Sequence, residues 1–530
     1  MKREAMVSRL AGGENKFDFV VIGGGATGLG VALDAATRGF SVALFEQWDF
    51  TKGTSSRSTK LVHGGVRYLA QGDIGLVLEA LRERGLLRRN APHLVKDQRF
   101  LIPCYQWWEA PFYTLGLILY DLMSGPLSFG PSRYLSAQRA HHLVPGLALG
   151  RLSGGVVYHD GQFDDSRLAM NLLRSAADAG ALVLNYMQVV SLCKTEGKVT
   201  GVKVCDGLSG NQYTIQARVV VNATGVFADR ILQMDQPGQP PTVRPSQGVH
   251  LVLDASFLSG DCAVMIPKTS DGRVLFAVPW HGKVVVGTTD TLRDKPEVEP
   301  VALEEEIDFI LDTAGRYLTR PPERRDVLSV FAGLRPLAAP RTGEKSTKEI
   351  SRSHKLFAEP SGLLQIIGGK WTTYRKMAED TVNLALSLAR LPARPCATRR
   401  FLLHGAKPDP DFSDPLYVYG TDAPEIRAFT ASSAGMSERL HPGYPHTVGE
   451  VVWIIRNEMP CRVEDILGRR LRMLFLDVRA ALEMAPRVAA LLAAEQGKSE
   501  EWAATEVAAF RRLAAHYLPA GVDSVASDKT

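Results

Sequence analysis

The spacing of hydrophobic and polar residues predicts a strand, a helix and a second strand at the beginning of the chain. Residues 17–22 (FDFVVI) form an apolar run that ends at a group of glycines. Apolar residues then recur with a helical period until Gly39, and a second apolar run covers residues 41–46. This order is typical of a βαβ unit, the building block of parallel sheets.

Further along, the pattern predicts another helix and then a region richer in strands. Asp164 or Asp165 is placed to cap a helix that ends at Gly180. Residues 197–222 alternate valines with polar residues and contain turn-forming Gly and Asn, which predicts hairpins. Residues 265–290 also resemble antiparallel strands. The middle of the chain is therefore expected to be rich in β structure.

The composition changes near residue 401, after which we expect a separate domain. Residues 407–419 are rich in Pro and Asp, and the sequence that follows is rich in Ala, Leu, Arg and Glu. This predicts a helical C-terminal domain over residues 401–520. A chain of 530 residues has room for about three units of roughly 150 residues each.

Composition and charge exclude several classes of protein. Hydrophobic residues at 45% and charged residues at 22% argue against long disorder and against a bundle of membrane spans. The net charge of +5 favours an anionic small molecule or an anionic surface as partner over a nucleic acid. The six cysteines have no metal-ligand spacing, so we expect neither a disulfide framework nor a metal site.

Two segments bear on membrane attachment. Residues 1–16 are polar and lack the apolar core of a signal peptide, so we expect a mobile arm. The longest apolar stretch, residues 111–125, is interrupted by Asp121 and is shorter than the roughly 20 residues of a spanning helix. It is either a docking surface for a membrane or a buried helix.

The first glycine group has the spacing of a dinucleotide-binding turn. Gly23, Gly25 and Gly28 fit GxGxxG between a strand and a helix, and Glu46 ends the next strand. These glycines allow a tight turn, a close approach to a pyrophosphate and helix–sheet packing, and the acid accepts hydrogen bonds from ribose. The alternative is an ordinary glycine-rich turn, which the combination with a strand, a helix and an acid disfavours.

Two later glycine turns favour FAD over NAD. Residues 222–225 (NATG) close a strand at Gly225, and residues 368–373 (GGKWTT) open a helix. A helix N-terminus placed there suits the flavin C2 carbonyl and N1, where negative charge collects on reduction. Without the first motif, both would be read as simple turns.

Longer motifs make the chain similar to a known family, the FAD-dependent glycerol-3-phosphate dehydrogenases of respiratory metabolism. That family belongs to the flavoproteins of the glycine-oxidase (D-amino-acid oxidase) type. The motifs are GTSSRSTKLVHGGVRYL (53–69), DGQFDDSRL (160–168), VRPSQGVHLVLD (243–254), FAGLRPL (331–337), SRSHKLF (351–357), IIGGKWTTYRKMAED (366–380) and EVVWIIRNEMPCRVEDILGRR (450–470).

The resemblance implies an α/β fold in three parts. The first is a discontinuous, Rossmann-like FAD-binding domain made of residues 17–80, 151–240 and 325–398. The second is a β-rich substrate domain made of residues 81–150 and 241–324. The helical C-terminal domain completes the chain.

The resemblance also implies the site residues. The residues that match the family's substrate pocket are Arg67, Tyr68, His250, Arg335, Arg352 and Lys370. Besides the three glycines and Glu46, the noncovalently bound FAD is assigned to Thr54, Ser55, Lys60, Gly225, Gly369, Lys370 and Thr372. We expect His250 and Arg335 to be catalytic. Arg335, Arg352 and Lys370 suit a phosphate dianion, whereas Arg67 and Tyr68 could instead brace a helix.

His250 is the candidate base, since an imidazole titrates near neutral pH and can accept the proton of a C2 hydroxyl. A lone histidine in an apolar strand such as GVHLVLD is more often a core residue, so both interpretations stay open.

The expected reaction is oxidation of sn-glycerol 3-phosphate to dihydroxyacetone phosphate by FAD, with electrons passed to a membrane quinone. This predicts a cytoplasmic protein, peripheral on the inner face of the cytoplasmic membrane, and a homodimer is left open. The alternatives are an oxygen-using glycerol-3-phosphate oxidase, an amine or amino-acid oxidase of the same fold, and a non-enzymatic flavin-binding module. The amino-acid oxidases need one arginine for a carboxylate, so three cationic residues argue against them.

Overall fold

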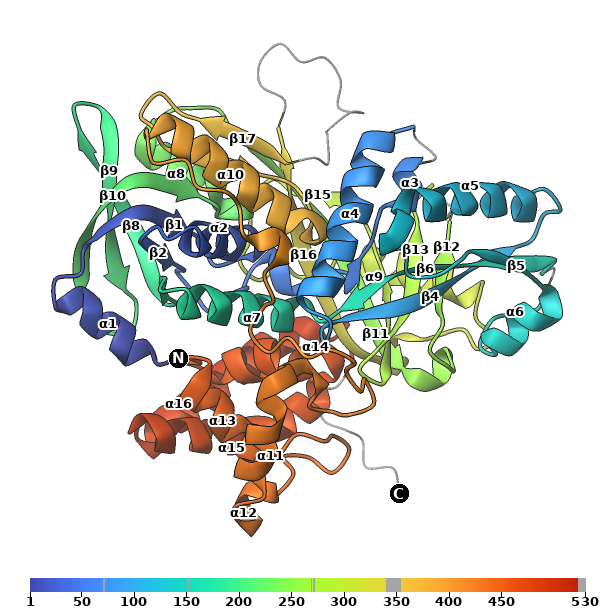
Figure 1. Cartoon of the computed structure of the whole chain (residues 1–530). Coiled ribbons are helices and arrows are strands. Elements are labelled where there is room, and N and C mark those ends of the chain that lie inside the picture. Colours follow the sequence, from blue (N-terminus) through green and yellow to red (C-terminus); the bar gives the residue numbers. More distant parts are fainter. Residues whose placement is uncertain (70–71, 151, 268, 270–271, 340–353, 523–530) are drawn as a thin grey trace.

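The computed structural model describes residues 1–69, 72–150, 152–267, 269, 272–339 and 354–522, except for the side chain of Arg67. In this part of the chain, two β-sheets lie next to each other and a group of helices lies below them (Figure 1). The cofactor motif belongs to the first sheet, and the strand that carries His250 belongs to the second.

The first sheet is parallel in its middle. Its strands are β1 (Lys16–Ile22), β2 (Val42–Phe45), β7 (Leu182–Leu184), β8 (Met187–Thr195), β9 (Lys198–Asp206), β10 (Gln212–Asn222), β17 (Lys355–Ala358) and β18 (Leu364–Ile367). The parallel order is β18-β10-β1-β2-β7, and β8, β9 and β17 add antiparallel pairs. Phe19, Val20 and Val21 of β1 are fully buried. Phe19 and Val21 pack with residues of the helical segments 26–37 and 374–388, whereas Val20 packs on the other face with residues of β8 and β9.

Helices from three parts of the chain pack around this sheet. They are α2 (Ala26–Thr37), α7 (Asp165–Asp178), α8 (Ala228–Asp235) and α10 (Tyr374–Leu388). Helix α2 contacts both α7 and α10. Asp164 caps α7 by accepting hydrogen bonds from the backbone N–H groups of Ser166 and Arg167, each at 3.0 Å. The cap that the sequence predicted near Asp164 is therefore present.

The second sheet is mostly antiparallel. Its strands are β3 (Leu61–Val62), β4 (Val95–Cys104), β5 (Arg133–Ser136), β6 (Gly154–Phe163), β11 (Val243–Asp254), β12 (Ala263–Ile266), β13 (Leu275–Trp280), β14 (Lys283–Gly287), β15 (Thr291–Leu292) and β16 (Val327–Ala338). Its helices are α3 (Val66–Leu69), α4 (Ile74–Asn90), α5 (Glu109–Ser124), α6 (Ala137–Leu143) and α9 (Glu304–Gly315). The long pair β11–β16 sets His250 opposite Phe331.

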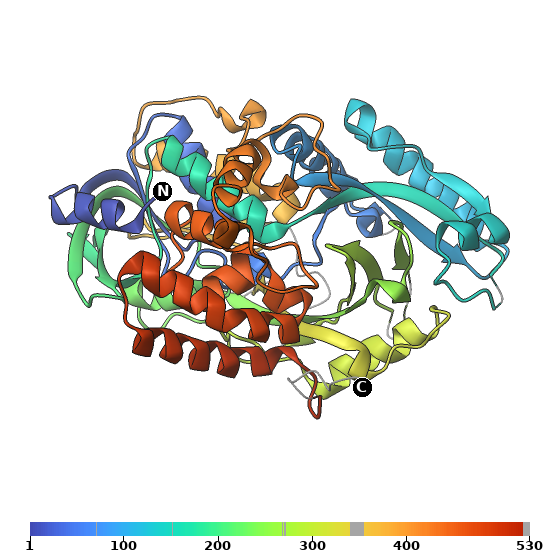
Figure 2. The ribbon, with the colours of Figure 1, turned by 90° about the horizontal axis from the view of Figure 1, so that it is seen from below.

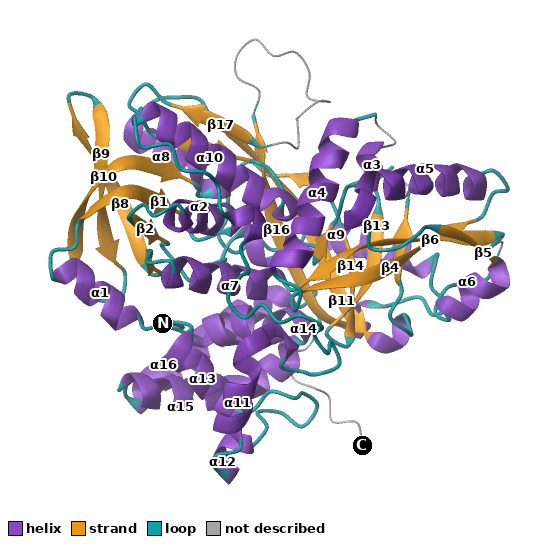
Figure 3. Ribbon diagram, in the orientation of Figure 1, coloured by secondary structure: helices purple, strands orange, loops and turns teal. Residues whose placement is uncertain are grey.

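The C-terminal part is helical, as predicted (Figures 2 and 3). Its helices are α11 (Ala423–Thr430), α12 (Ala434–Ser437), α13 (Val448–Asn457), α14 (Met473–Leu476), α15 (Val478–Gln496) and α16 (Glu500–Ala514). Buried ion pairs fix it to the first sheet and its helices: Arg470 pairs with Asp49, and Arg167 of α7 pairs with Glu458 at 2.7 Å.

The expectation of a mobile arm over residues 1–16 is wrong. Residues Arg3–Ala11 form helix α1, whose Leu10 is buried among residues of the first sheet. Arg3 pairs with Asp206 of β9 at 2.7 Å. Met6 and Leu10 are four residues apart, so they fall on one helix face and give this short segment a side to bury.

Three strands that the sequence placed in the FAD-binding domain pair in the second sheet. Residues 61–62, 154–163 and 327–338 fall in the ranges assigned to the FAD-binding domain, yet β3, β6 and β16 pair in the second sheet. Packing between distant segments determines which strands pair. The hydrophobic pattern of one strand does not reveal its partner.

Candidate active site

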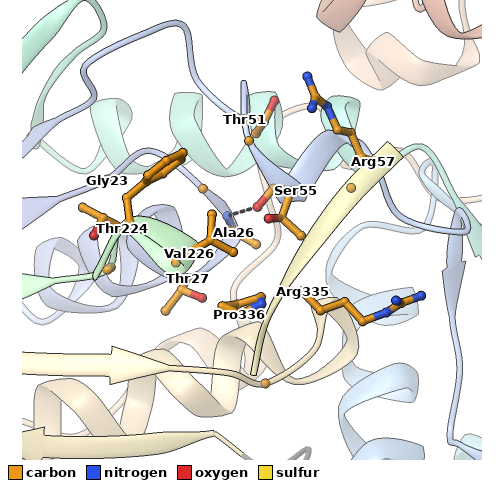
Figure 4. Close-up of a pocket in the computed structure, with 18 of the residues that line it drawn as sticks. Gly23, Ala26, Thr27, Thr51, Ser55, Arg57, Thr224, Val226, Arg335 and Pro336 are labelled. Atoms are coloured by element: carbon orange, nitrogen blue, oxygen red, sulfur yellow. Dashed lines mark hydrogen bonds between the residues drawn. The ribbon is translucent and has the colours of Figure 1, made fainter. Parts of the chain in front are cut away.

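The turn between β1 and α2 has the backbone that a dinucleotide-binding loop requires. Gly23 has a φ of 107°, which glycine adopts without steric cost. A Cβ on Gly28 would lie 1.9 Å from the carbonyl oxygen of Gly23, so only glycine lets α2 pack this closely. Gly25 is the N-cap of α2, and Ser55 Oγ accepts a hydrogen bond from the Ala26 backbone N–H at 2.9 Å (Figure 4).

Glu46 lies beside this turn, directly after β2. Its carboxylate accepts hydrogen bonds from the backbone N–H groups of Gly24 at 2.7 Å and of Trp48 at 2.9 Å. Burial raises the pKa of the Glu46 carboxyl, and these hydrogen bonds oppose the rise. An acid at the end of the second strand is the position from which a ribose is bound.

A cavity of about 410 Å³ is lined both by this turn and by residues of the second sheet. Figure 4 shows Gly23, Ala26 and Thr224 on one side of it and Arg335 on the other. Most of the predicted cofactor residues line this cavity: Gly23, Gly25, Glu46, Thr54, Ser55, Gly225, Gly369, Lys370 and Thr372. Gly28 lies behind them, where it packs α2 against the turn.

The later glycine turns also reach the cavity. Gly225 and Gly369 have φ values of 58° and 82°. A Cβ on Gly369 would lie 2.3 Å from Met377 Sδ, so a larger residue here would also displace the end of that side chain. Thr372 precedes α10 and bonds through its hydroxyl to the backbone N–H and carbonyl of His63, each at 3.2 Å. The N-terminal end of α10 is thereby held at the cavity.

Four residues of the predicted substrate pocket meet in the cavity: Tyr68, His250, Arg335 and Lys370. The Arg335 guanidinium donates to Thr288 Oγ1 at 3.2 Å and pairs with Asp290 at 3.3 Å. Lys370 Nζ lies 4.0 Å from the centre of the Tyr68 ring, a cation–π contact. Arg335 and Lys370 are two of the cationic residues that line the cavity, together with Lys52, Arg57 and Arg230, and such a lining suits an anionic ligand.

His250 lies on β11 and is 2% exposed, yet its side chain lines the cavity. Its Nε2 is 2.9 Å from Thr59 Oγ1, and its ring stacks on Phe331 with centres 4.9 Å apart. Burial, Lys60 and Arg335 lower the pKa of His250 well below its usual value. An imidazole that stays uncharged at neutral pH is able to accept a proton.

The prediction that Lys60 contacts the cofactor is contradicted. Lys60 is fully buried, does not line the cavity, and donates from Nζ to Asp165 at 2.8 Å. Its φ of 64° turns the side chain away from the neighbours that face the cavity, Ser58 and Thr59. Arg352 and the side chain of Arg67 lie outside the described part of the chain.

Sequence reasoning missed Arg57. Arg57 is among the residues that line the cavity (Figure 4). Its guanidinium donates to Glu299 at 2.5 Å and to the Tyr517 hydroxyl at 3.2 Å. Glu299 also pairs with Lys52, which pairs with Glu464 at 2.6 Å. These contacts connect the cavity wall to the C-terminal domain. The signal was present, since Arg57 lies in the motif GTSSRSTKLVHGGVRYL.

The residues present fit FAD. Gly23 and Gly28 leave a cradle that side chains would fill, and the start of α2 and the turn before α10 place the positive ends of two helix dipoles at two places along one cavity. The α2 turn and Glu46 would hold the pyrophosphate and ribose, and the turn at Gly369 and Thr372 would hold the flavin.

Comparisons with known proteins agree with this interpretation. A family described as FAD dependent oxidoreductase matches residues 18–375, and one described as C-terminal domain of alpha-glycerophosphate oxidase matches residues 364–503. The mitochondrial glycerol-3-phosphate dehydrogenase SDP6 of Arabidopsis thaliana is 42% identical over 93% of this chain and 85% of its own length.

Solved structures confirm the predicted fold class. The glycerol-3-phosphate dehydrogenase from Bacillus halodurans complexed with FAD superposes with a TM-score of 0.80 at 30% identity, over 98% of both chains. Glycine oxidase from Geobacillus kaustophilus shares the fold, with a TM-score of 0.53 at 20% identity over 73% of this chain and 98% of its own. The protein is FAD-dependent, and the chain belongs to the family of FAD-dependent glycerol-3-phosphate dehydrogenases.

Proposed function

We propose that the protein oxidises sn-glycerol 3-phosphate to dihydroxyacetone phosphate in this cavity. The observation that carries the proposal is the meeting of His250, Arg335 and Lys370 in the cavity that the dinucleotide turn also lines. A phosphate dianion requires cationic donors, and oxidation of a secondary alcohol requires an unprotonated base near its hydroxyl. Two cations favour a phosphate over the single carboxylate of an amino acid.

Each side chain has one task in this reaction. Bound FAD supplies the two-electron oxidant. Arg335 and Lys370 bind the phosphate, and their charges orient the substrate with C2 toward the base. His250 accepts the proton of the C2 hydroxyl, which its uncharged imidazole is able to do. The resemblance assigns Arg67 and Arg352 to the same pocket.

Anaerobic addition of glycerol 3-phosphate to the purified protein tests the proposal. The visible flavin absorbance should bleach, and dihydroxyacetone phosphate should form in a 1:1 ratio to bleached flavin. Glycerol, which lacks the phosphate, is the control and should leave the spectrum unchanged at the same concentration. A flavin that stays oxidised with glycerol 3-phosphate would show that the cavity has another substrate.

The second part of the proposal is that electrons pass to a quinone at the inner face of the cytoplasmic membrane. Helix α5 lies at the outer edge of the second sheet (Figure 1). Its solvent-facing side is apolar, as is the segment before it; the exposed residues are Trp107, Trp108, Phe112, Leu115, Ile118, Leu119 and Leu122. Contiguous apolar surface of this kind marks an interaction site. No helix among the described residues is long and apolar enough to span a bilayer.

Vesicle flotation tests this docking surface. Leu115 and Leu119 are 73% and 48% exposed, so Leu115→Glu together with Leu119→Glu should not disturb the core. The double variant should float with anionic vesicles several-fold less than the unsubstituted protein, because two charges oppose insertion. The matched control is Leu208→Glu, an exposed leucine on the turn between β9 and β10.

The acceptor is measured separately. Quinone reduction by vesicle-bound protein, without accumulation of peroxide, supports the proposal. Oxygen consumption with stoichiometric peroxide at an equal or higher rate would make the protein an oxidase instead.

A further inference from the structure

Lys60 is a buried cation that the proposed reaction does not use. Its side chain is 0% exposed, and Nζ donates to the Ser56 carbonyl and to Asp165, each at 2.8 Å. The ammonium also lies over three aromatic rings, at 5.1 Å from Trp280, 5.0 Å from Phe331 and 5.4 Å from Phe475. Burying an ammonium costs free energy, so this position calls for a physical reason.

The neighbour that Lys60 shares with the active site is Phe331. The ammonium lies 5.0 Å from the centre of the Phe331 ring, and the imidazole of His250 stacks on that ring at 4.9 Å. Thr59, the residue before Lys60, bonds to Nε2 of His250 at 2.9 Å. One dipeptide therefore fixes the imidazole by a hydrogen bond and places a positive charge against the aromatic ring on which the imidazole stacks.

The carboxylates that balance Lys60 lie on another element. Asp165 of α7 is shared by Lys60 and Arg472, which pairs with it at 3.0 Å. Asp164, the cap of α7, accepts from His281 at 3.1 Å and lies 3.5 Å from Arg472. Among the described residues, the charged groups that act on His250 itself are Lys60 and Arg335, both cations, and both lower its pKa.

The two cations differ in one respect. Arg335 lines the cavity, and a phosphate bound there would neutralise its effect on His250. Lys60 does not line the cavity, and burial lowers the pKa of its ammonium to about 8, so below that pH its charge acts on His250 whether or not substrate is present. We propose that Lys60 is a positioning residue whose ammonium keeps His250 uncharged, so that the base is ready before the substrate binds. This inference rests on the proposed role of His250 as base.

The protonation of His250 can be measured without turnover. The test is a pH titration of the oxidised holoenzyme by NMR with 13C-labelled histidine. The His250 signal is assigned by its absence in His250→Gln. In the unsubstituted protein the midpoint should lie below about 6.5, the ordinary histidine value. In Lys60→Met it should rise by about one pH unit, since a nearby like charge has been removed.

The Lys60→Met substitution should also shift the pH dependence of flavin reduction in a definite direction. A higher pKa keeps His250 protonated up to a higher pH. In Lys60→Met, the fall in the rate of flavin reduction on the acid side of the pH profile should therefore begin at a higher pH, by the same amount. Lys283→Met is the matched control. It removes an ammonium from β14, the strand next to β11, where Lys283 pairs with Asp254 at the surface at 3.2 Å. Its midpoint should equal that of the unsubstituted protein.

Lys60→Met leaves Asp165 with one cation fewer, which could prevent folding. The double variant Lys60→Met/Asp165→Asn removes both charges; because the carboxylate 2.8 Å away opposes the ammonium, its His250 midpoint should rise by less than in Lys60→Met. An unchanged midpoint in either folded variant overturns the proposal, and so does a midpoint at or above about 6.5 in the unsubstituted protein. Failure of glycerol 3-phosphate to bleach the flavin would instead overturn the proposed function, and the midpoints would still be measurable.

Discussion

The two ends of the cavity are built in different ways. At the end formed by β1 and α2, one short segment faces the cavity through its backbone, and the side chains of Glu46 and Ser55 bond to that turn. At the other end, side chains of His250, Arg335 and Lys370 come from three segments far apart in the sequence. The first end depends on the absence of side chains, and the second depends on the register of β11 against β16. A change at the first end should therefore remove the cofactor, whereas a change at the second should spare it.

The largest effect is expected from Gly28→Val. A Cβ at this position would lie 1.9 Å from the Gly23 carbonyl oxygen, so α2 must move away from the turn. The protein should be colourless, and the free energy of unfolding should fall by about 3 kcal/mol or more. Flavin absorbance per polypeptide and thermal unfolding measure these effects. Gly116→Ala, where a Cβ meets open space on α5, is the control and should keep full colour.

His250→Gln should leave the flavin content intact and slow flavin reduction at saturating substrate. The expected loss is about 10² to 10⁴ in rate, the usual contribution of a general base. Because the pKa of His250 is lowered, the rate in the unsubstituted protein should stay flat as the pH falls from 8 to about 6.5. Stopped-flow bleaching is the measurement, with His159→Gln on β6 as control. An unchanged rate would return His250 to the role of a core histidine.

Arg335→Ala should weaken the apparent affinity for glycerol 3-phosphate roughly 10- to 100-fold, since charged hydrogen bonds contribute about 1.5 to 3 kcal/mol each. The rate at saturating substrate should change far less. KM and kcat from steady-state kinetics separate the two effects. If flavin is lost as well, Arg335 supports the fold and the two ends are not independent.

The smallest effect is expected from Gly248→Ala, which places a methyl group at the substrate end. A Cβ there would lie 2.4 Å from Nη2 of Arg335, the far end of a flexible side chain, so the guanidinium can shift. We expect KM to rise about tenfold or less, with the flavin retained. Loss of flavin in this glycine variant would contradict the difference between the two ends.

The cofactor end could be predicted from the sequence because its signal is local. The spacing of Gly23, Gly25 and Gly28 and the acid at Glu46 specify a turn, and the structure places them together. The position of Lys60 could not be predicted from its local sequence. It lies in the motif GTSSRSTKLVHGGVRYL beside cavity residues, but its backbone turns the side chain into the interior. Residues 1–16 were misjudged for a similar reason, since docking of α1 depends on a surface elsewhere.

The sequence alone determined the family, the cofactor, the elements of the βαβ unit and the helical C-terminal domain, since each follows from a repeating or contiguous pattern. The tertiary structure decided which sheet β16 joins, which face of α5 is exposed, and that Lys60 is buried against Phe331 and does not line the cavity. These features arise when residues far apart in the sequence pack together. The sequence of a single strand or helix does not specify which elements it packs against. Those neighbouring elements determine whether a charged side chain is buried.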